Sequence, residues 1–299
     1  MSGRRSLVGL IGANIMSSLS PALHEDAFAA AGIRGTYHLM DLDRLPGRRL
    51  GDLLAAVKAA GFDGVNVTFP CKQAVMPLLD EISPEAQQIG AVNSVTIAND
   101  GRTVGYNTDR IGFRRNFEEG LGRACVEDQT AVLVGAGGAG RAVAFALMDL
   151  GAGTVGVHDT DMARAAALVA DLMGHYGSAR CRLADSLPEA ISAAAGVVNA
   201  TPVGMQGIPG NPVPVAALSS RHWVADVIYT PIETELIEAA RAAGARVLTG
   251  GGMCVHQAAE TFRLFTGLQP DVGRMHRTFA TVLAARDAAA PAATAGGKP

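Results

Sequence analysis

The chain has 299 residues, a formal net charge of −3, 48% hydrophobic and 18% charged residues, which is typical of a soluble globular protein with room for about two domains. Its basic residues form no cluster beyond single pairs, so the sequence gives no indication of nucleic-acid binding. No apolar run approaches the roughly 18 residues needed to cross a bilayer, and we expect a cytoplasmic protein without a membrane partner.

The first part of the chain alternates between short apolar runs, which are typical of buried strands, and helical patterns. The apolar runs predict strands at residues 7–11, 36–42 and 64–68. The helical patterns predict helices at residues 22–31, 50–60, 75–79 and 111–121. Residues 91–98 and 103–107 should form a hairpin, because the turn tripeptide Asn99-Asp100-Gly101 lies between them.

A glycine-rich loop begins after the apolar run 131–134 and leads into a helical pattern. The loop residues are Gly135, Ala136, Gly137, Gly138 and Ala139. Such a loop lets the backbone approach a pyrophosphate at the N-terminus of a helix. A second strand at 154–158 then ends in Asp159, whose carboxylate can accept hydrogen bonds from both ribose hydroxyls and would repel a 2′-phosphate. This order predicts a dinucleotide site that prefers NAD over NADP.

The second half continues the alternation and implies parallel sheets with helical crossovers. Strands are expected at 196–200, 222–228 and 245–248, and helices at 163–173, 235–243, 253–265 and 270–283. The Ala-, Pro- and Gly-rich end should be disordered. The four cysteines are scattered without a CxxC pattern, so we expect reduced thiols and no metal site.

Polar residues gather where the predicted strands end, and each has an ordinary structural interpretation beside a functional one. Ser18 and Ser20 could chelate a carboxylate, although Ser20 alone would cap a helix. Thr68 and Lys72 flank a proline turn, although most lysines are simply solvated. Further candidates are Asn93, Asp109, Tyr229 and Gln257.

Taken together, the motifs resemble the shikimate dehydrogenase family over residues 7–283. Their order is Ser-x-Ser-Pro, Asn-Val-Thr-x-Pro-x-Lys, Gly-Ala-Val-Asn, Asn-Thr-Asp, Gly-Ala-Gly-Gly-Ala, Asn-Ala-Thr-Pro-x-Gly-Met, Asp-x-x-Tyr and Gly-Met-x-x-x-Gln-Ala. Within the family the chain is similar to the NAD-preferring quinate/shikimate dehydrogenases at Asp159 and at residues 231–236, 256–258 and 262–267. NADP-dependent relatives usually have Asn-Arg-Thr where this chain has His158-Asp159-Thr160.

The resemblance implies an α/β fold of two domains. Residues 1–108 with 253–285 would form the substrate-binding domain, residues 109–252 the NAD-binding Rossmann domain, and residues 286–299 a disordered tail. The C-terminal helices would return to the first domain, with the active site in the cleft between the two. A monomer and a homodimer both remain open.

The resemblance also assigns roles to residues. Lys72 and Asp109 would be catalytic, and which of them is the base stays open. Shikimate or quinate would be bound by Ser18, Ser20, Thr68, Lys72, Asn93, Asp109, Tyr229 and Gln257. The cofactor would be held by Gly135, Ala136, Gly137, Gly138, Ala139, Asp159, Arg164, Thr201, Pro202, Met205, Val227, Gly250 and Met253. Arg164 is otherwise a solvated residue on a helix.

The implied reaction is reversible, NAD-dependent oxidation of the C3 hydroxyl of shikimate, with quinate as a second substrate. One departure favours shikimate, because quinate-active relatives often have threonine at the position of Ser20. The alternatives are an NADP-dependent biosynthetic shikimate dehydrogenase, an aminoshikimate dehydrogenase, and a non-catalytic dinucleotide-binding regulator. The presence of both Lys72 and Asp109 disfavours the regulator.

Overall fold

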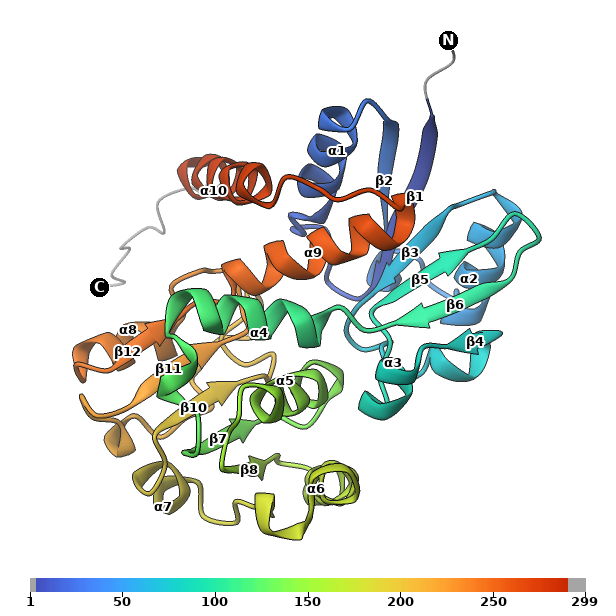
Figure 1. Ribbon diagram of the computed structural model, residues 1–299. Coiled ribbons are helices and arrows are strands. Elements are labelled where there is room, and N and C mark those ends of the chain that lie inside the picture. The colour runs from blue at the N-terminus through green and yellow to red at the C-terminus, as the bar shows by residue number, and fades with distance from the viewer. Residues whose placement is uncertain (1–3, 290–299) are drawn as a thin grey trace, which may run out of the picture.

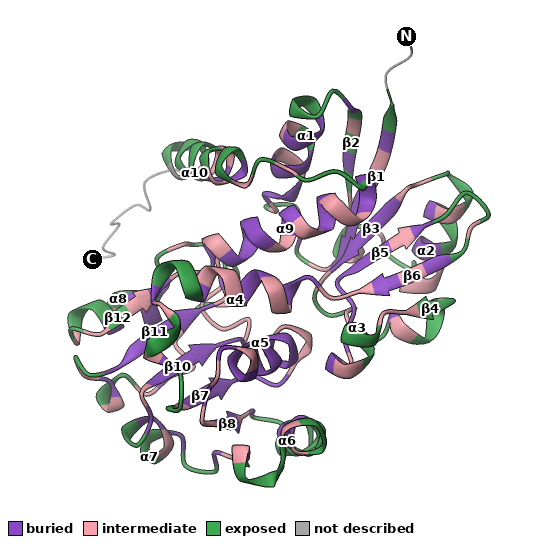
Figure 2. Cartoon of the chain, in the orientation of Figure 1, coloured by how far each residue is buried: buried purple, intermediate pink, exposed green. Residues whose placement is uncertain are grey.

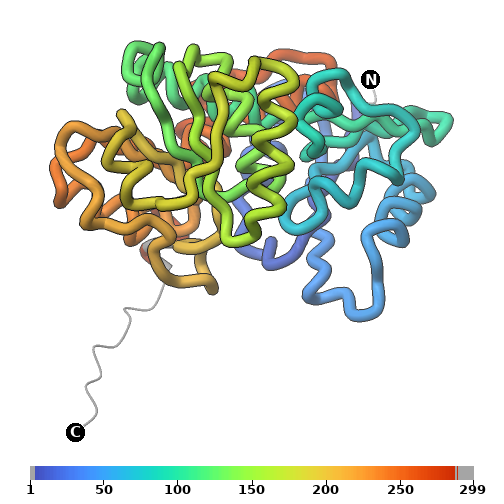
Figure 3. The backbone as a smooth tube through the Cα atoms, turned by 90° about the horizontal axis from the view of Figure 1, so that it is seen from below, coloured from blue at the N-terminus to red at the C-terminus, as the bar shows by residue number. Residues whose placement is uncertain are grey.

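The protein folds into two lobes, each built around a six-stranded sheet (Figure 1). The computed structural model describes residues 4–289. Figure 3 shows the same division from below, with the N-terminal segments in blue to teal on one side and the yellow to orange segments on the other. Within the described residues, no helix is both long enough and apolar enough to span a bilayer.

The first sheet is mixed and has the order β2-β1-β3-β5-β6-β4. Its strands are β1 (Arg5–Gly12), β2 (Arg34–Asp41), β3 (Gly64–Val67), β4 (Glu81–Ile82), β5 (Ser94–Ile97) and β6 (Thr103–Tyr106). The expected hairpin is present as β5 and β6, and β5 also runs antiparallel to β3. The predicted hairpin reverses one strand, so this sheet is mixed and not parallel throughout.

The second sheet is parallel throughout and has the order β12-β11-β10-β7-β8-β9. Its strands are β7 (Thr130–Val134), β8 (Thr154–His158), β9 (Cys181–Leu183), β10 (Gly196–Asn199), β11 (Trp223–Asp226) and β12 (Arg246–Leu248). The strand order reverses between β7 and β10, which gives the sheet the crevice where dinucleotides bind in doubly wound folds.

Helices cover both sheets. They are α1 (Ser20–Ala30), α2 (Leu50–Ala59), α3 (Pro84–Ile89), α4 (Asp109–Gly120), α5 (Gly138–Asp149), α6 (Met162–Tyr176), α7 (Leu187–Ser192), α8 (Glu235–Ala242), α9 (Gly251–Thr266) and α10 (Val272–Ala289). Figure 2 shows α5 buried along almost its whole length, since it packs against the second sheet, α4 and α6. Its small Ala residues allow this close packing.

Helices α4 and α9 lie side by side between the lobes, and α10 packs against α1 (Figure 1). The chain thus leaves the first lobe at the start of α4 and returns to it at the start of α9. Glycines permit the close approach: a Cβ at Gly252 would lie 2.0 Å from Oδ1 of Asn116, and one at Gly112 would lie 3.0 Å from Cβ of Gln257. The C-terminal helices therefore pack on the first lobe, as expected.

Two predicted segments differ from the structure. The helix expected at residues 75–79 is only a short 3-10 helix, Met76–Leu78, because Pro77 provides no backbone N–H and disfavours a helical residue before it. Helix α10 extends to Ala289, so residues 286–289 are helical although they were assigned to a disordered tail. The rest of that tail, residues 290–299, lies outside the described residues.

A buried histidine in the first lobe predicts a loss of stability in acid. His24 stacks on Tyr37, with ring centroids 4.9 Å apart, and burial lowers its pKa from 6.5 to about 3. Below pH 6.5 the His24 side chain of the unfolded chain takes up a proton, whereas that of the folded chain stays neutral. The contribution of His24 to the free energy of unfolding is therefore complete above that pH and is lost as the pH falls. Proton linkage at His24 should lower the free energy of unfolding by about 2 kcal/mol between pH 7.5 and pH 5.

Urea unfolding of His24→Leu at both pH values measures this cost, with His38→Leu at an exposed position as the control. Asp226 should stabilise the fold as the pH falls over the same range, since burial raises its pKa to about 6. The informative quantity is therefore the difference between variant and wild type in the change of unfolding free energy with pH. The His24 variant should show the weaker acid destabilisation. An unchanged pH dependence in that variant would show that His24 does not contribute.

Candidate active site

A cleft of about 810 Å³ lies between the two lobes. It is bordered by the loops that follow β1 and β3 in the first sheet and β7, β8, β10 and β11 in the second. These loops leave the carboxyl ends of strands, which is where ligands bind in open α/β sheets. All eight residues predicted to bind substrate line this cleft: Ser18, Ser20, Thr68, Lys72, Asn93, Asp109, Tyr229 and Gln257.

Most of the predicted cofactor residues line the same cleft. They are Gly135, Gly137, Gly138, Ala139, Asp159, Arg164, Thr201, Pro202, Met205, Val227 and Met253. Ala136 and Gly250 are not among the lining residues. Ala136 is fully buried, and a Cβ at Gly250 would lie 2.4 Å from the carbonyl oxygen of Val227, so Gly250 allows close packing where α9 begins.

The two predicted catalytic residues form an ion pair in the cleft. Lys72 Nζ lies 2.5 Å from Asp109 Oδ2, and their side chains are 15% and 6% exposed. Lys72 follows β3 and the turn at Pro70, whereas Asp109 is the first residue of α4. The pair therefore joins a loop of the first sheet to a helix between the lobes, and solvent reaches it mainly through the cleft.

Asn93 fixes the second oxygen of the carboxylate. Its Nδ2 donates to Asp109 Oδ1 at 2.9 Å and to Thr108 Oγ1 at 2.9 Å, and its Oδ1 accepts from the backbone N–H of Thr108 at 2.8 Å. Thr108 Oγ1 lies 3.2 Å from the hydroxyl of Thr261 on α9. This buried network holds Asp109 in one orientation, with one oxygen on Lys72 and the other on Asn93. Thr261 was not predicted, since nothing in the local sequence links it to Asn93.

A group of hydroxyls lies at another part of the cleft. The hydroxyl of Ser18 accepts from the backbone N–H of Ser20 at 3.2 Å, and Tyr229 lines the same cleft. Burial raises the pKa of Tyr229 well above 10, so its phenol stays protonated and can donate. Burial, with a contribution from the charge of Asp109, also raises the pKa of the neighbouring Cys254 to about 12. These groups form a neutral, hydroxyl-rich surface suited to a carboxylate.

Gln257 on α9 lies beside this network. Its Nε2 donates to the carbonyl oxygen of Cys254 at 2.9 Å, and its Oε1 lies 3.5 Å from Thr108 Oγ1. The amide therefore lines the cleft next to Asn93 and Asp109, where it could bind a further hydroxyl of a ligand.

The glycine loop has the geometry that a dinucleotide requires. Gly135 has a φ of 101°, which favours glycine, and a Cβ at Gly140 would lie only 1.9 Å from the carbonyl oxygen of Gly135. Gly137 directly precedes α5 and has open space where a Cβ would be. The N-terminus of α5 therefore presents backbone N–H groups to the cleft, as phosphate binding needs.

The same loop brings the two predicted sites together. A Cβ at Gly138 would lie 2.8 Å from Cβ of Lys72, so glycine lets the loop and the lysine stem pass closely. A group bound along this loop is thereby adjacent to the Lys72–Asp109 pair. The residues present fit a dinucleotide bound along this loop, next to that pair.

Asp159 lies at the end of β8, beside the glycine loop. Its Oδ2 accepts from the backbone N–H of Ala136 at 2.7 Å, and its Oδ1 accepts from the N–H of Asp161 at 2.9 Å. The guanidinium group of Arg164 lies 3.9 Å from the carboxylate of Asp159 and 3.4 Å from that of Asp161. The carboxylate is thus held rigidly at the cleft, while the Arg164 cation is shared between two acids.

The structure also identifies lining residues that sequence reasoning missed. Among them are Asn14, Asn66, Phe69, Gln73, Thr160, Gln206, Asn211 and Cys254. Asn14 Nδ2 donates to the carbonyl oxygen of Gln206 at 3.3 Å, which connects the two lobes at the cleft. Asp226, at the end of β11, accepts from the N–H of Ile228 and so fixes the loop that carries Tyr229. Asn66 lies within β3 and Cys254 within α9, so a position just after a strand could not have identified all of these residues.

Comparison with known proteins agrees with this geometry. Residues 10–95 match the family description "Shikimate dehydrogenase substrate binding domain", and residues 250–278 match "Shikimate 5′-dehydrogenase C-terminal domain". A quinate/shikimate dehydrogenase (NAD(+)) of Corynebacterium efficiens is 50% identical over 277 residues, covering 91% of this chain and 97% of the relative.

A shikimate dehydrogenase (NADP(+)) of Streptomyces avermitilis is also 50% identical, over 90% of this chain and 93% of its own length. Among solved structures, quinate dehydrogenase from Corynebacterium glutamicum in complex with NAD is 47% identical, with a TM-score of 0.84 over 93% of this chain and 100% of its own. The relatives thus include both cofactor classes at equal identity. The chain belongs to the shikimate dehydrogenase family and is an oxidoreductase that binds NAD(P).

Proposed function

We propose that the protein catalyses the reversible, NAD-dependent oxidation of the C3 hydroxyl of shikimate, with quinate as a second and poorer substrate. The observation that carries this proposal is the Lys72–Asp109 pair, with Nζ and Oδ2 2.5 Å apart, directly beside the glycine loop at Gly138. The pair can receive the hydroxyl proton while the neighbouring loop aligns the cofactor.

In the proposed reaction, the cofactor and the protein would contribute different parts of the chemistry. A bound nicotinamide dinucleotide supplies the acceptor for the hydride, which comes from C3 of the substrate. The hydroxyl proton passes to the Lys72–Asp109 pair, and Asn93 keeps Asp109 oriented throughout. Ligands bound in the cleft would exclude bulk water from the pair, so the protein's contribution is alignment and a fixed electrostatic environment.

The proposed orientation of the substrate follows from the two polar ends of its site. The hydroxyls of Ser18, Ser20 and Tyr229 would bind the carboxylate, which leaves the ring hydroxyls to Asn93 and Gln257. In this orientation the C3 hydroxyl faces Lys72 and Asp109. Thr68 lines the cleft between these groups and would contact the ring.

The preference for NAD is supported by Asp159. Its rigid carboxylate lies where the adenosine ribose of a Rossmann-bound dinucleotide is held, and it would repel a 2′-phosphate. Arg164 is paired with Asp161 and Asp159 and so offers little free positive charge to such a phosphate.

Quinate should be oxidised with NAD, but less efficiently than shikimate. It has an additional hydroxyl at C1, and this hydroxyl needs a partner among Ser18, Ser20 and Tyr229, because an unpaired buried hydroxyl costs about 1–3 kcal/mol. That cost corresponds to a catalytic efficiency about 5- to 150-fold lower. Initial rates of NAD reduction with each substrate measure the ratio.

A wild-type enzyme that turns over shikimate with NAD but produces no detectable NADH from millimolar quinate would contradict the proposal of two substrates. Aminoshikimate, assayed in parallel, tests the alternative that the protein is an aminoshikimate dehydrogenase. If aminoshikimate were the most efficient substrate of the three, the proposed substrate would be wrong while the assigned chemistry would remain.

A further inference from the structure

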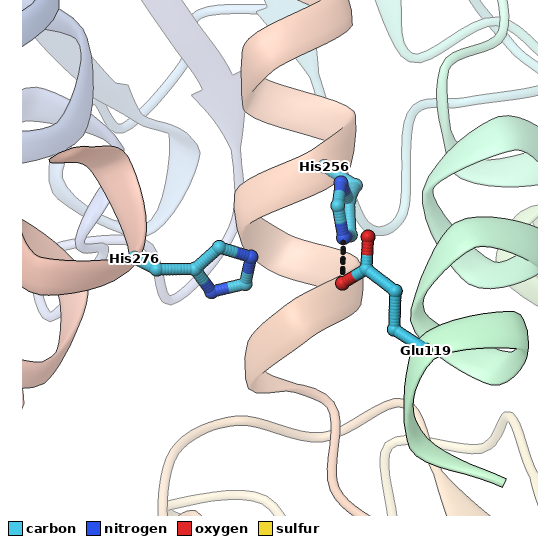
Figure 4. A group of neighbouring side chains, drawn as sticks. All are labelled: Glu119, His256 and His276. Atoms are coloured by element: carbon cyan, nitrogen blue, oxygen red, sulfur yellow. Dashed lines mark hydrogen bonds and ion pairs between the residues drawn. The ribbon is translucent and has the colours of Figure 1, made fainter. Parts of the chain in front are cut away.

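The structure brings together two histidines and a glutamate on three helices, away from the cleft. Glu119 lies on α4, His256 on α9 and His276 on α10 (Figure 4). Each provides one possible ligand atom, and these three atoms all lie within 4.8 Å of one another. We propose that Glu119, His256 and His276 bind a divalent transition-metal ion, of which zinc fits best, at the junction of α4, α9 and α10.

The spacing of the three donors suits a small metal ion. His256 Nε2 lies 2.9 Å from Glu119 Oε2, and the rings of His256 and His276 meet edge to face with centroids 5.2 Å apart. Ligands about 2.0–2.1 Å from a tetrahedral zinc ion lie about 3.3 Å from each other. Small side-chain rotations would therefore seat the ion, and Figure 4 shows the His276 ring directed toward the other two side chains.

The surroundings of His256 support a ligand role. Its side chain is only 3% exposed, whereas that of Glu119 is 62% exposed. Its Nδ1 is buried and has no hydrogen-bond partner within the described part of the chain, so Glu119 is the one hydrogen-bond partner of its ring there. A buried imidazole whose one hydrogen bond goes to a solvent-facing carboxylate, with a second imidazole beside it, gains from a metal that joins the three groups.

The donor set indicates which ion fits. Two imidazole nitrogens and one carboxylate oxygen suit zinc and its neighbours in the first transition row, whereas calcium and magnesium prefer oxygen alone. Because Glu119 and the half-buried His276 reach solvent, a water molecule can complete a fourth position. The expectation that the chain has no metal site rested on cysteine spacing and could not reveal this arrangement.

The position of the cluster indicates its role. Glu119 lies ten residues beyond Asp109 on α4, which is about 15 Å along the helix, so the ion would not touch the reacting atoms. It would instead connect the helix that begins with Asp109, the helix that carries Gln257, and α10. Metal binding should therefore stabilise the packing of these three helices.

The test uses the full chain without a polyhistidine tag, after metal has been removed with a chelator. Titration with Co²⁺ should produce the visible d–d absorption of a tetrahedral site at one equivalent, and Zn²⁺ should displace it. Glu119→Gln and His276→Ala should each raise the dissociation constant at least about tenfold. His38→Ala, at an exposed position on β2, should bind like wild type.

Glu119→Gln keeps the proposal falsifiable if the histidine variant fails to fold, because Glu119 is exposed and its amide has nearly the same shape. A rise in the unfolding temperature with Zn²⁺ in wild type, but not in Glu119→Gln, would support the site independently of catalysis. The proposal is overturned if wild type takes up no stoichiometric metal. It is equally overturned if the Glu119 variant binds as tightly as wild type, which would assign the metal to other groups such as the cysteines.

Discussion

Replacing Lys72 with alanine should lower turnover of shikimate by about 10² to 10⁴, which is the usual contribution of a general acid–base group. The loss follows from the geometry, since Lys72 Nζ is held 2.5 Å from Asp109 and both face the cleft. The affinity for the dinucleotide should barely change, because the lysine belongs to the first lobe and contacts the glycine loop only through its stem. Steady-state kinetics combined with direct cofactor titration separate the two quantities.

Two further variants define the control. Lys72→Met retains most of the stem that packs near Gly138, so it should lose turnover while keeping the loop in place. Lys58→Ala removes a lysine that pairs with Asp80 in the same lobe and should leave turnover unchanged. If Lys72→Ala kept more than half of the wild-type turnover, Lys72 would be an ordinary solvated lysine and the proposed mechanism would fail.

The second large effect concerns the choice of cofactor. Asp159→Ala should raise the Michaelis constant for NAD about tenfold or more, since a hydrogen bond to a charged group contributes about 1.5–3 kcal/mol. It should also raise catalytic efficiency with NADP, because the carboxylate that would repel a 2′-phosphate is lost. Kinetics with both dinucleotides at saturating shikimate measure the change.

Asp161→Ala is the matched control for this experiment. Asp161 also pairs with Arg164, at 3.4 Å, but does not line the cleft. The control variant thus removes one of the two acidic partners of Arg164 but keeps the proposed ribose acceptor, and its Michaelis constant for NAD should stay near wild type. Equal effects of the two substitutions would attribute cofactor choice to Arg164 instead of Asp159.

Local patterns were sufficient to predict much of the architecture. The β7–α5–β8 unit with Asp159 at its end could be identified because strand, glycine loop, helix and acid are consecutive in the sequence. The short edge strand β9 and helix α7 were missed, since segments of three and six residues show no reliable periodicity. Strand β4 was not predicted for the same reason, because it has only two residues.

The contacts that assemble the site could not be derived from the residues alone. Lys72 and Asp109 are 37 residues apart, and resemblance to a family, not spacing, brought them together before the structure did. The support of Asn66 by Thr261, across 195 residues, had no sequence signal at all. The same holds for Glu119 and His256, which are 137 residues apart and meet only because glycines let α4 and α9 pack closely.

The most direct test of the central claim is a comparison of NAD and NADP as acceptors for shikimate oxidation by the wild-type protein. Initial rates over a range of each dinucleotide give kcat/KM for both cofactors under identical conditions. We predict that the value for NAD exceeds that for NADP by at least about tenfold, from the ribose contact and phosphate repulsion at Asp159. A higher value with NADP, or no dinucleotide reduction with either cofactor, would contradict the account.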